Sequence, residues 1–322
     1  MDHTNRSSQS TPDKSPDASG LHERTGTVTT PDGRQLAYLE VGDPHGPLVL
    51  HNHGGPGSRL EARLFAAVAM KHRLRLLCID RPGFGQSSPQ PSRSFADWAT
   101  DLTTVADALG YRQFGVTGWS EGGPWALAAA AYIAPDRLRH VSSIAPACYG
   151  TFGENWAAKH LSKADALGGF LALHFEPGFR LMYATIGLTA QHFRQTYYRS
   201  LIKAVNDYDR EVLHRPGIEI PFCEESAECF AQGSEGLILD SELIYRQWTF
   251  DVTTIRRAHD GNIVTPVHLW QGTTDTLVPA VINEEVASRS PGIRLHSVRN
   301  GGHFIAIGEA ERIFGIAKEE LG

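Results

Sequence analysis

The sequence predicts an α/β fold with a mostly parallel sheet of eight strands, helices on both faces and a helical insertion. Three observations lead to this prediction. Short apolar runs alternate with amphipathic stretches of helix length, which is typical of parallel strands buried on both faces. One of these runs enters a helix through a Gly-x-Ser-x-Gly turn. The alternation stops near residue 146 and resumes near residue 263, so the 322 residues form one domain with an insertion or two domains.

Composition and charge limit the classes of function. Hydrophobic residues make up 41% of the chain and charged residues 20%, which is ordinary for a globular protein. A net charge of −6 without a basic cluster argues against nucleic acid or an anionic membrane as the main partner. No apolar run approaches the ~20 residues that span a bilayer, and the first residues lack the apolar core of a signal peptide. We therefore expect a cytoplasmic protein.

The four cysteines do not form a metal-binding pattern. They have no CxxC pairing and are interpreted as structural; they are Cys78, Cys148, Cys223 and Cys229. Residues 1–24 are rich in Ser, Thr, Asp and Pro and have almost no apolar side chains. Such a composition cannot offset the entropy cost of ordering, so this segment is predicted to be a disordered tail.

Strands and helices are predicted in turn from residue 25 to about residue 145, the first part of the α/β core. A Pro-Asp-Gly turn at 31–33 joins two strand-like segments into a hairpin. Apolar runs predict further strands at 47–52, 75–79, 115–118 and 138–144. Helical periodicity predicts helices at 60–71, 95–109 and 121–134.

The segment 146–262 is predicted to be a helical insertion rich in aromatic residues. Its clearest amphipathic stretches are 170–174, 178–188, 190–204 and 237–250. The α/β pattern returns in 263–322, with strands at 264–270 and 293–298 and helices at 280–288 and 309–321.

Ser120 occupies the centre of the turn between strand 115–118 and the following helix. Gly118 and Gly122 flank it, as expected where a strained turn leaves no room for a Cβ atom. The turn exposes the serine hydroxyl and leaves the amide of Glu121 at a helix N-terminus, where negative charge is favoured. Ser120 is therefore a candidate nucleophile whose attack would create an oxyanion near that amide.

A serine hydroxyl needs a base to accept its proton and a carboxylate to orient that base. Asp275 lies just beyond strand 264–270, and His303 lies just beyond strand 293–298. Adjacent parallel strands bring their carboxyl ends to one edge of the sheet, where the Ser120 turn also emerges. The alternative acids Asp240, Asp251 and Asp260 and the alternative bases His174, His192, His214 and His268 lack this position after an apolar strand.

With these motifs and two glycine-rich loops, HGGPG at 53–57 and DRPGFGQS at 80–87, the chain resembles α/β-hydrolase-fold serine hydrolases from Thr25 to Gly322. The resemblance implies a catalytic triad of Ser120, Asp275 and His303. It implies an oxyanion hole formed by the amides of Gly55 and Glu121, with the helical insertion as a cap. His53 and the 80–87 turn are interpreted as structural, and no metal or organic cofactor is implied.

The sequence is compatible with cleavage of more than one kind of bond. The HGGPG loop resembles that of proline iminopeptidases, which need acidic cap residues to bind a free amino terminus. Glu224, Glu225 and Glu228 can serve, although a solvated helix face is the favoured interpretation of this run. Those peptidases carry the aromatic residue after the serine, whereas here Trp119 precedes it and Glu121 follows it.

Ester hydrolysis is therefore the expected activity, on a small and largely apolar substrate contacted by Trp119 and Trp248. An aminopeptidase, a lactonase or a carbon–carbon hydrolase with the same triad stays open, as does a ligand receptor on this fold. The expected partner is a small molecule, without nucleic acid or membrane, and the protein is expected to be a monomer or a homodimer.

Overall fold

The computed structural model describes residues 22–255 and 264–322, and it contains the predicted sheet of eight strands. The strand order is β1-β2-β4-β3-β5-β6-β7-β8; β2 runs antiparallel to both neighbours, and the other adjacent pairs are parallel. The strands are β1 (Glu23–Thr29), β2 (Gln35–Gly42), β3 (Leu48–Asn52), β4 (Arg75–Ile79), β5 (Phe114–Trp119), β6 (Leu138–Ile144), β7 (Val267–Gly272) and β8 (Ile293–Val298).

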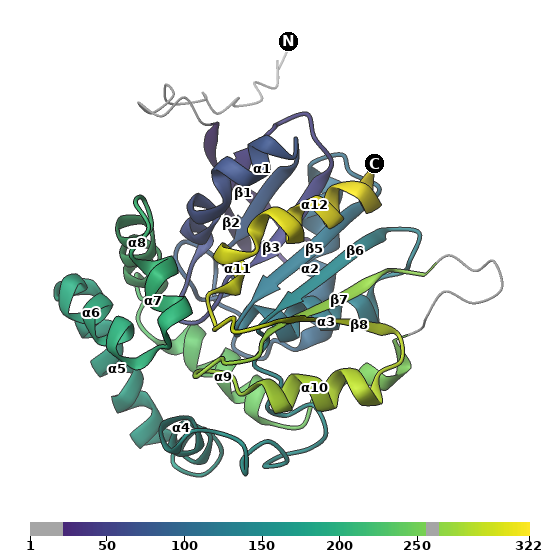
Figure 1. The fold of residues 1–322 in the computed structure, drawn as a ribbon. Helices are drawn as coiled ribbons and strands as arrows, with labels where there is room; N and C mark the ends of the chain where they lie inside the picture. Colours follow the sequence, from purple (N-terminus) through teal and green to yellow (C-terminus); the bar gives the residue numbers. More distant parts are fainter. Residues whose placement is uncertain (1–21, 256–263) are drawn as a thin grey trace.

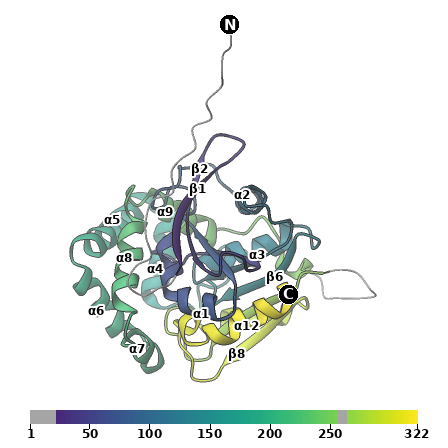
Figure 2. The ribbon, with the colours of Figure 1, turned by 90° about the horizontal axis from the view of Figure 1, so that it is seen from above.

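Both faces of the sheet are covered, as the near-continuous apolar strands predict. In β3, Leu48 and Leu50 enter one apolar core, whereas Val49 between them enters the other. Figures 1 and 2 show the helices of the two layers on either side of the strands. One layer contains α2 (Phe95–Ala108), α3 (Gly122–Tyr132) and α10 (Ala280–Arg289); the other contains η1 (Arg59–Phe65), α1 (Ala66–Lys71), α11 (Ile305–Gly308) and α12 (Ala310–Leu321).

Several boundaries differ from the sequence-based prediction. The helix predicted at 60–71 is a 3₁₀ helix, η1, that continues into α1. β1 begins at Glu23, which pairs with Val41, so the last residues assigned to the tail are part of the sheet. The rest of the predicted tail, residues 1–21, lies outside the described residues, as do Asp260 and the predicted boundary at 262.

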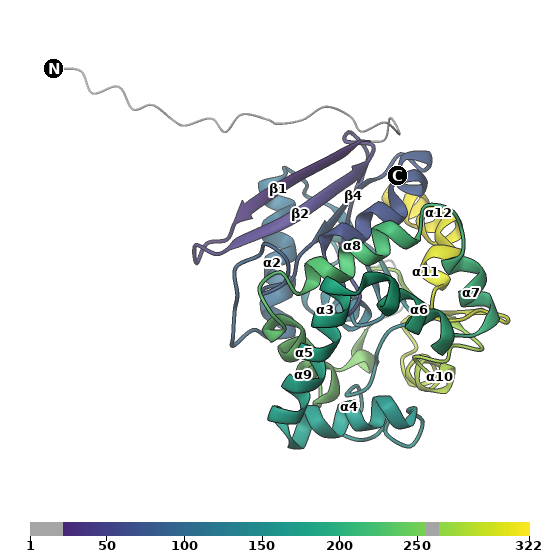
Figure 3. The same cartoon turned by 90° about the vertical axis from the view of Figure 1, so that its left-hand side faces the viewer.

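The insertion forms a layer of helices beside one end of the sheet. This layer faces the viewer in Figure 3. It contains α4 (Lys163–His174), α5 (Glu176–His192), α6 (Arg194–Ala204), α7 (Asp207–Leu213), α8 (Glu219–Cys229) and α9 (Glu235–Tyr245); the short η2 (Val252–Thr254) follows. The sequence did not predict α7, and the interpretation of Glu224, Glu225 and Glu228 in α8 as a solvated helix face is wrong for Glu225, which is 1% exposed. These helices bury the carboxyl side chains of Asp209 and Glu225, which interrupt the apolar periodicity that identifies an amphipathic helix.

Buried ion pairs join the insertion to the core. Arg81, in the turn after β4, is fully buried and donates to the carbonyl oxygens of His53 and Gly54. Its guanidinium also pairs with Asp240 on α9, and Arg93 pairs with the same carboxylate. The 80–87 turn therefore has the structural role expected of it, and the carboxylate of Asp240 is bound by Arg81 and Arg93. Within the described residues, no helix has the length and apolarity needed to cross a membrane.

Replacing Asp240 tests this connection. Asp240→Asn leaves Arg81 and Arg93 buried without a counter-charge, so the free energy of unfolding is expected to fall by about 3–5 kcal/mol in urea denaturation. Glu242→Gln is the matched control on the same helix, because Glu242 makes only a 3.9 Å pair with the exposed Arg246; it is expected to change stability by less than about 1 kcal/mol. Equal effects of the two substitutions on stability would contradict the role of Asp240 as the counter-charge of Arg81 and Arg93.

Candidate active site

Ser120 lies directly after β5 in a backbone conformation that side chains rarely adopt, with φ of +56°. The flanking glycines allow it. A Cβ atom at Gly118 would lie 2.2 Å from the carbonyl oxygen of Gly122, and a Cβ atom at Gly122 would lie 2.1 Å from that of Asn52. Both contacts are impossible, so the turn requires glycine at both positions.

His303 lies between Ser120 and Asp275. Its Nε2 is 2.9 Å from the Ser120 hydroxyl oxygen, and its Nδ1 is 2.9 Å from a carboxylate oxygen of Asp275. The other carboxylate oxygen of Asp275 accepts hydrogen bonds of 2.8 Å from the amides of Leu277 and Val278, which fixes its orientation. The three residues predicted from separate loops thus meet at the carboxyl edge of the sheet, linked in one hydrogen-bonded chain.

The surroundings of His303 favour its protonated form. Burial lowers the pKa of its imidazole, but the Asp275 carboxylate together with those of Asp209 and Asp165 outweighs this effect, and the net shift is upward. An imidazolium at this position is therefore stabilised at the moment when the ring has accepted the serine proton.

Asp209 holds the backbone of the His303 loop from the insertion. Its buried carboxylate on α7 accepts a 2.8 Å bond from the amide of His303 and a 2.7 Å bond from that of Phe304. The indole of Trp119 donates to the carbonyl oxygen of His303 at 3.0 Å. Sequence reasoning missed Asp209, because its partners lie more than 90 positions away and no local motif marks it.

The 53–57 loop is held against the nucleophile. A Cβ atom at Gly54 would lie 3.6 Å from the Cβ of Ser120. The buried carboxylate of Glu61 accepts from the Gly54 amide at 2.9 Å and lies 2.6 Å from Nε2 of His51. His53 has the structural role expected of it, with its ring between the Gly54 carbonyl and the Arg81 amide. The amides of Gly55 and Glu121 have no backbone acceptor in the described part of the chain.

Ser120 and His303 open into a cavity of about 380 Å³ between the sheet and the insertion. Aromatic side chains form much of its wall; they are Trp119, Tyr149, Phe179, Tyr183, Tyr197, Phe222, Tyr245 and Phe304. Trp248, predicted to contact substrate, does not line this cavity. Its ring packs against Phe95 and Phe250 in the core, because α9 ends at Tyr245 and the following segment turns into the layer of α2 and α3.

Four carboxyl side chains line the same cavity, and the described lining contains no lysine or arginine; the four are Glu61, Glu121, Asp165 and Glu225. Of the three acidic residues singled out on the insertion, only Glu225 reaches the cavity. Glu224 pairs with Arg63 and Glu228 with Arg59, each at 2.7 Å. Glu225 is 1% exposed, burial raises its pKa, and its Oε2 has no hydrogen-bond partner among the described residues.

Glu121 places a buried carboxyl group beside Ser120. Its Oε1 accepts from the Ser241 hydroxyl at 3.3 Å, and its Oε2 has no partner within the described residues. Burial, with the nearby Asp240 carboxylate, raises the pKa of Glu121 to about 7. Its carboxyl lies against Gly55, where an added Cβ would be 2.0 Å from Oε2, so any larger residue at position 55 would displace the Glu121 side chain.

Comparison with known proteins places this geometry in a family. Residues 47–310 match the family model described as alpha/beta hydrolase fold. Over 106 residues the chain is 32% identical to a proline iminopeptidase of Xylella fastidiosa, covering 32% of this chain and 34% of that protein. Over 125 residues it is 30% identical to a non-heme chloroperoxidase of Streptomyces lividans, covering 38% of this chain and 45% of that protein. The chain thus matches less than half the length of these curated relatives.

Solved structures agree with the fold over most of the chain. An alpha/beta hydrolase fold protein from Nakamurella multipartita superposes with a TM-score of 0.65 at 22% identity, covering 92% of this chain and 100% of that one. An esterase from Exiguobacterium antarcticum superposes with a TM-score of 0.62 at 14% identity, covering 92% and 98%. At these identities the likeness establishes the fold alone.

The raised pKa of His303 predicts how the reactivity of Ser120 depends on pH. Labelling of Ser120 by a fluorophosphonate should slow as pH falls through the His303 pKa, because imidazolium cannot accept the serine proton. The midpoint is expected above the ordinary histidine value of about 6.5. Asp275→Asn should move the midpoint to lower pH, and Ser120→Ala should abolish labelling. A labelling rate independent of pH between about 5 and 9 would contradict the assignment.

Proposed function

Since the chain belongs to the alpha/beta hydrolase family, we propose that it is a serine hydrolase that cleaves a carboxylic ester through an acyl-enzyme intermediate. The observation that supports this best is the hydrogen-bonded chain from Ser120 through His303 to Asp275, with both links at 2.9 Å. Nucleophile, base and orienting acid stand in the order and geometry that acyl transfer requires.

In the proposed reaction, the Ser120 hydroxyl oxygen attacks the ester carbonyl carbon while Nε2 of His303 takes the hydroxyl proton. The amides of Gly55 and Glu121 donate to the oxyanion, and one such donor is typically worth ~10²–10³ in rate. When the intermediate collapses, His303 gives its proton to the departing alcohol oxygen. Water, activated by the same imidazole, then attacks the acyl-enzyme and releases the acid.

The wall of the cavity supports a largely apolar substrate. Aromatic rings from the insertion, such as Phe179 and Phe222, face the same space as Ser120. Such a wall binds hydrophobic groups, while the few polar groups near the serine fix orientation. Substrate contact by Trp119, the cytoplasmic location and the monomeric or dimeric state stay predictions.

A second candidate is an aminopeptidase that recognises a free amino terminus. The specific observation in its favour is Glu225, a buried carboxyl whose Oε2 has no hydrogen-bond partner among the described residues, in a cavity lined by three further acids. A protonated amine would supply the missing partner and the compensating charge. The partial match to the proline iminopeptidase of Xylella fastidiosa also supports this candidate.

Ester hydrolysis tests the first proposal. The native chain is expected to turn over p-nitrophenyl esters from acetate to decanoate repeatedly, and the preferred acyl length measures the space beside Ser120. Ser120→Ala should reduce kcat by about 10⁴-fold or more, because the nucleophile is lost while binding is kept. Folded protein with no turnover on any ester in the series would refute the esterase and favour a peptidase or a receptor.

The second candidate predicts a change in selectivity. The substrates are proline p-nitroanilide and its N-acetylated counterpart, which lacks the positive charge. If Glu225 binds the amine, Glu225→Gln should lower the preference for the charged substrate, measured as a ratio of kcat/KM values, by about tenfold or more. Glu224→Gln, one position away and paired with Arg63, should leave the ratio unchanged. A native chain without preference for the free amine rules this candidate out.

A further inference from the structure

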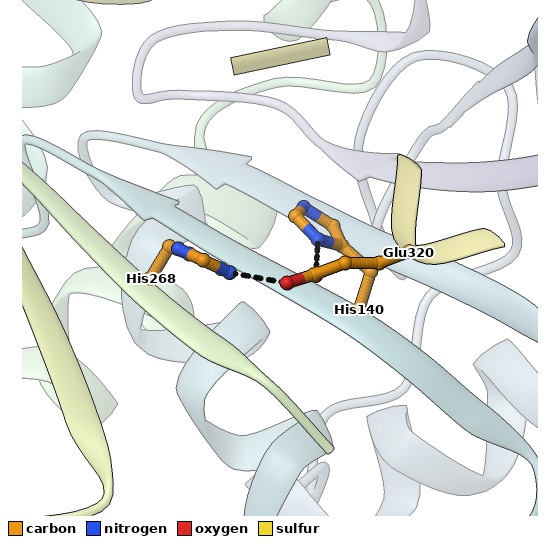
Figure 4. A group of neighbouring side chains, drawn as sticks. All are labelled: His140, His268 and Glu320. Carbon is orange, nitrogen blue, oxygen red and sulfur yellow. Dashed lines mark hydrogen bonds and ion pairs between the residues drawn. The ribbon is translucent and has the colours of Figure 1, made fainter. Parts of the chain in front are cut away.

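We propose that His140, His268 and Glu320 form a binding site for a divalent transition-metal ion of the Zn²⁺ class, separate from the Ser120 site. Figure 4 shows the two histidines projecting from neighbouring strands toward a glutamate of the last helix. One ligand atom from each residue lies within 4.8 Å of the other two. Neither the cysteine spacing nor the family resemblance points to a metal, and these three ligands are 52 or more positions apart and form no motif.

The cluster lies far from the nucleophile. His140 is near the beginning of β6 and pairs in register with Gly115, five residues before Ser120 along β5. At about 3.3 Å per residue, the two sites are roughly 17 Å apart along the sheet. His268 is the second residue of β7, and Glu320 lies in the last turn of α12. The cluster is therefore at the opposite end of the strands from the candidate active site.

The spacing of the ligand atoms suits a metal ion. Nδ1 of His140 is 2.6 Å from Oε2 of Glu320, and Nε2 of His268 is 3.0 Å from Oε1 of the same carboxylate. Ligands about 2.0 Å from a tetrahedral zinc ion are about 3.3 Å from one another. The two nitrogen–oxygen distances are shorter than this value, and all three ligand atoms lie within 4.8 Å of one another, so the side chains already converge on one point that an ion can occupy.

The donor set is also appropriate. Two imidazole nitrogens and one carboxylate oxygen are ligands that Zn²⁺ binds in proteins, with water in a fourth position. Both histidine side chains are buried, whereas the side chain of Glu320 is 22% exposed. The exposed edge of Glu320 provides the entry path and the place for that water.

In each histidine one ring nitrogen faces Glu320, and the other, here called the outer nitrogen, has a partner that can either donate or accept a hydrogen bond. Nε2 of His140 is 2.9 Å from the Ser142 hydroxyl, and Nδ1 of His268 is 2.8 Å from Nε2 of His296. A metal ion would bind the lone pair of the ring nitrogen that faces Glu320, so the outer nitrogen would carry the proton and donate a hydrogen bond. Both histidines can change tautomer in this way without leaving a buried N–H group unpaired. A cluster serving only as a hydrogen-bonded anchor does not need this flexibility.

Zn²⁺ and Co²⁺ binding by the chelator-treated full chain tests the proposal. One ion per chain is expected by calorimetry, with visible absorption bands for Co²⁺ in low-symmetry coordination. Zn²⁺ should raise Tm by about 3 °C or more, because the ion binds the folded state and joins α12 to the sheet. Ser120→Ala should bind the ion as the native chain does.

Glu320→Gln removes a ligand and should weaken binding at least tenfold and abolish the Zn²⁺-dependent shift in Tm. Glu319→Gln is the matched control, because it removes the same charge from an exposed neighbouring position. If Glu320→Gln fails to fold, His296→Ala, which removes the partner of His268 Nδ1 along with a ring stacked on Trp270, should lower the affinity by about 10–100-fold. The absence of stoichiometric binding, or an affinity of Glu320→Gln or His296→Ala equal to that of the native chain, would overturn the site.

Discussion

The close contact between backbone segments around Ser120 is the constraint on which the rest of the site depends. The turn places Gly122 against the carbonyl oxygen of Asn52, so β3, β5 and the start of α3 meet with no space for side chains. This contact fixes the nucleophile at the edge of the sheet and leaves the Glu121 amide at a helix terminus. It also sets the direction from which His303 must approach, because Nε2 has to reach an oxygen whose position the backbone has already determined.

Polar groups of the insertion complete this arrangement. Asp209 fixes the backbone of the His303 loop, and Asp240 fixes Arg81, which in turn holds the carbonyl oxygens of His53 and Gly54. The insertion therefore orients both His303 and the 53–57 loop in addition to covering the cavity. A change in the position of the insertion would therefore alter the geometry around Ser120 as well as access to Ser120.

The sequence was sufficient for features that are determined locally. Apolar runs gave the eight strands, and the loops after β5, β7 and β8 gave Ser120, Asp275 and His303, because the topology of a parallel sheet brings such loops to one edge. The sequence was insufficient where contacts between residues far apart in the chain determine the position of a side chain. Asp209 and Glu225 are buried in helices that no periodicity marked, and Trp248 lies in the core because α9 ends earlier than predicted. The partners of Arg81 likewise cannot be identified without the fold.

The carboxyl groups in the cavity affect the two proposed reactions in opposite ways. Ester hydrolysis converts a neutral substrate into a carboxylate, and Glu121, with a pKa of about 7, becomes increasingly negative as pH rises above neutrality. Like charges in a buried cavity repel, so the acid product is driven out while the neutral ester is not penalised. A substrate with a protonated amine would instead be attracted, and its binding would favour ionisation of Glu225. The same residues can therefore assist release in one reaction and recognition in the other, which explains why the charge of the substrate separates the two functions more sharply than the triad does.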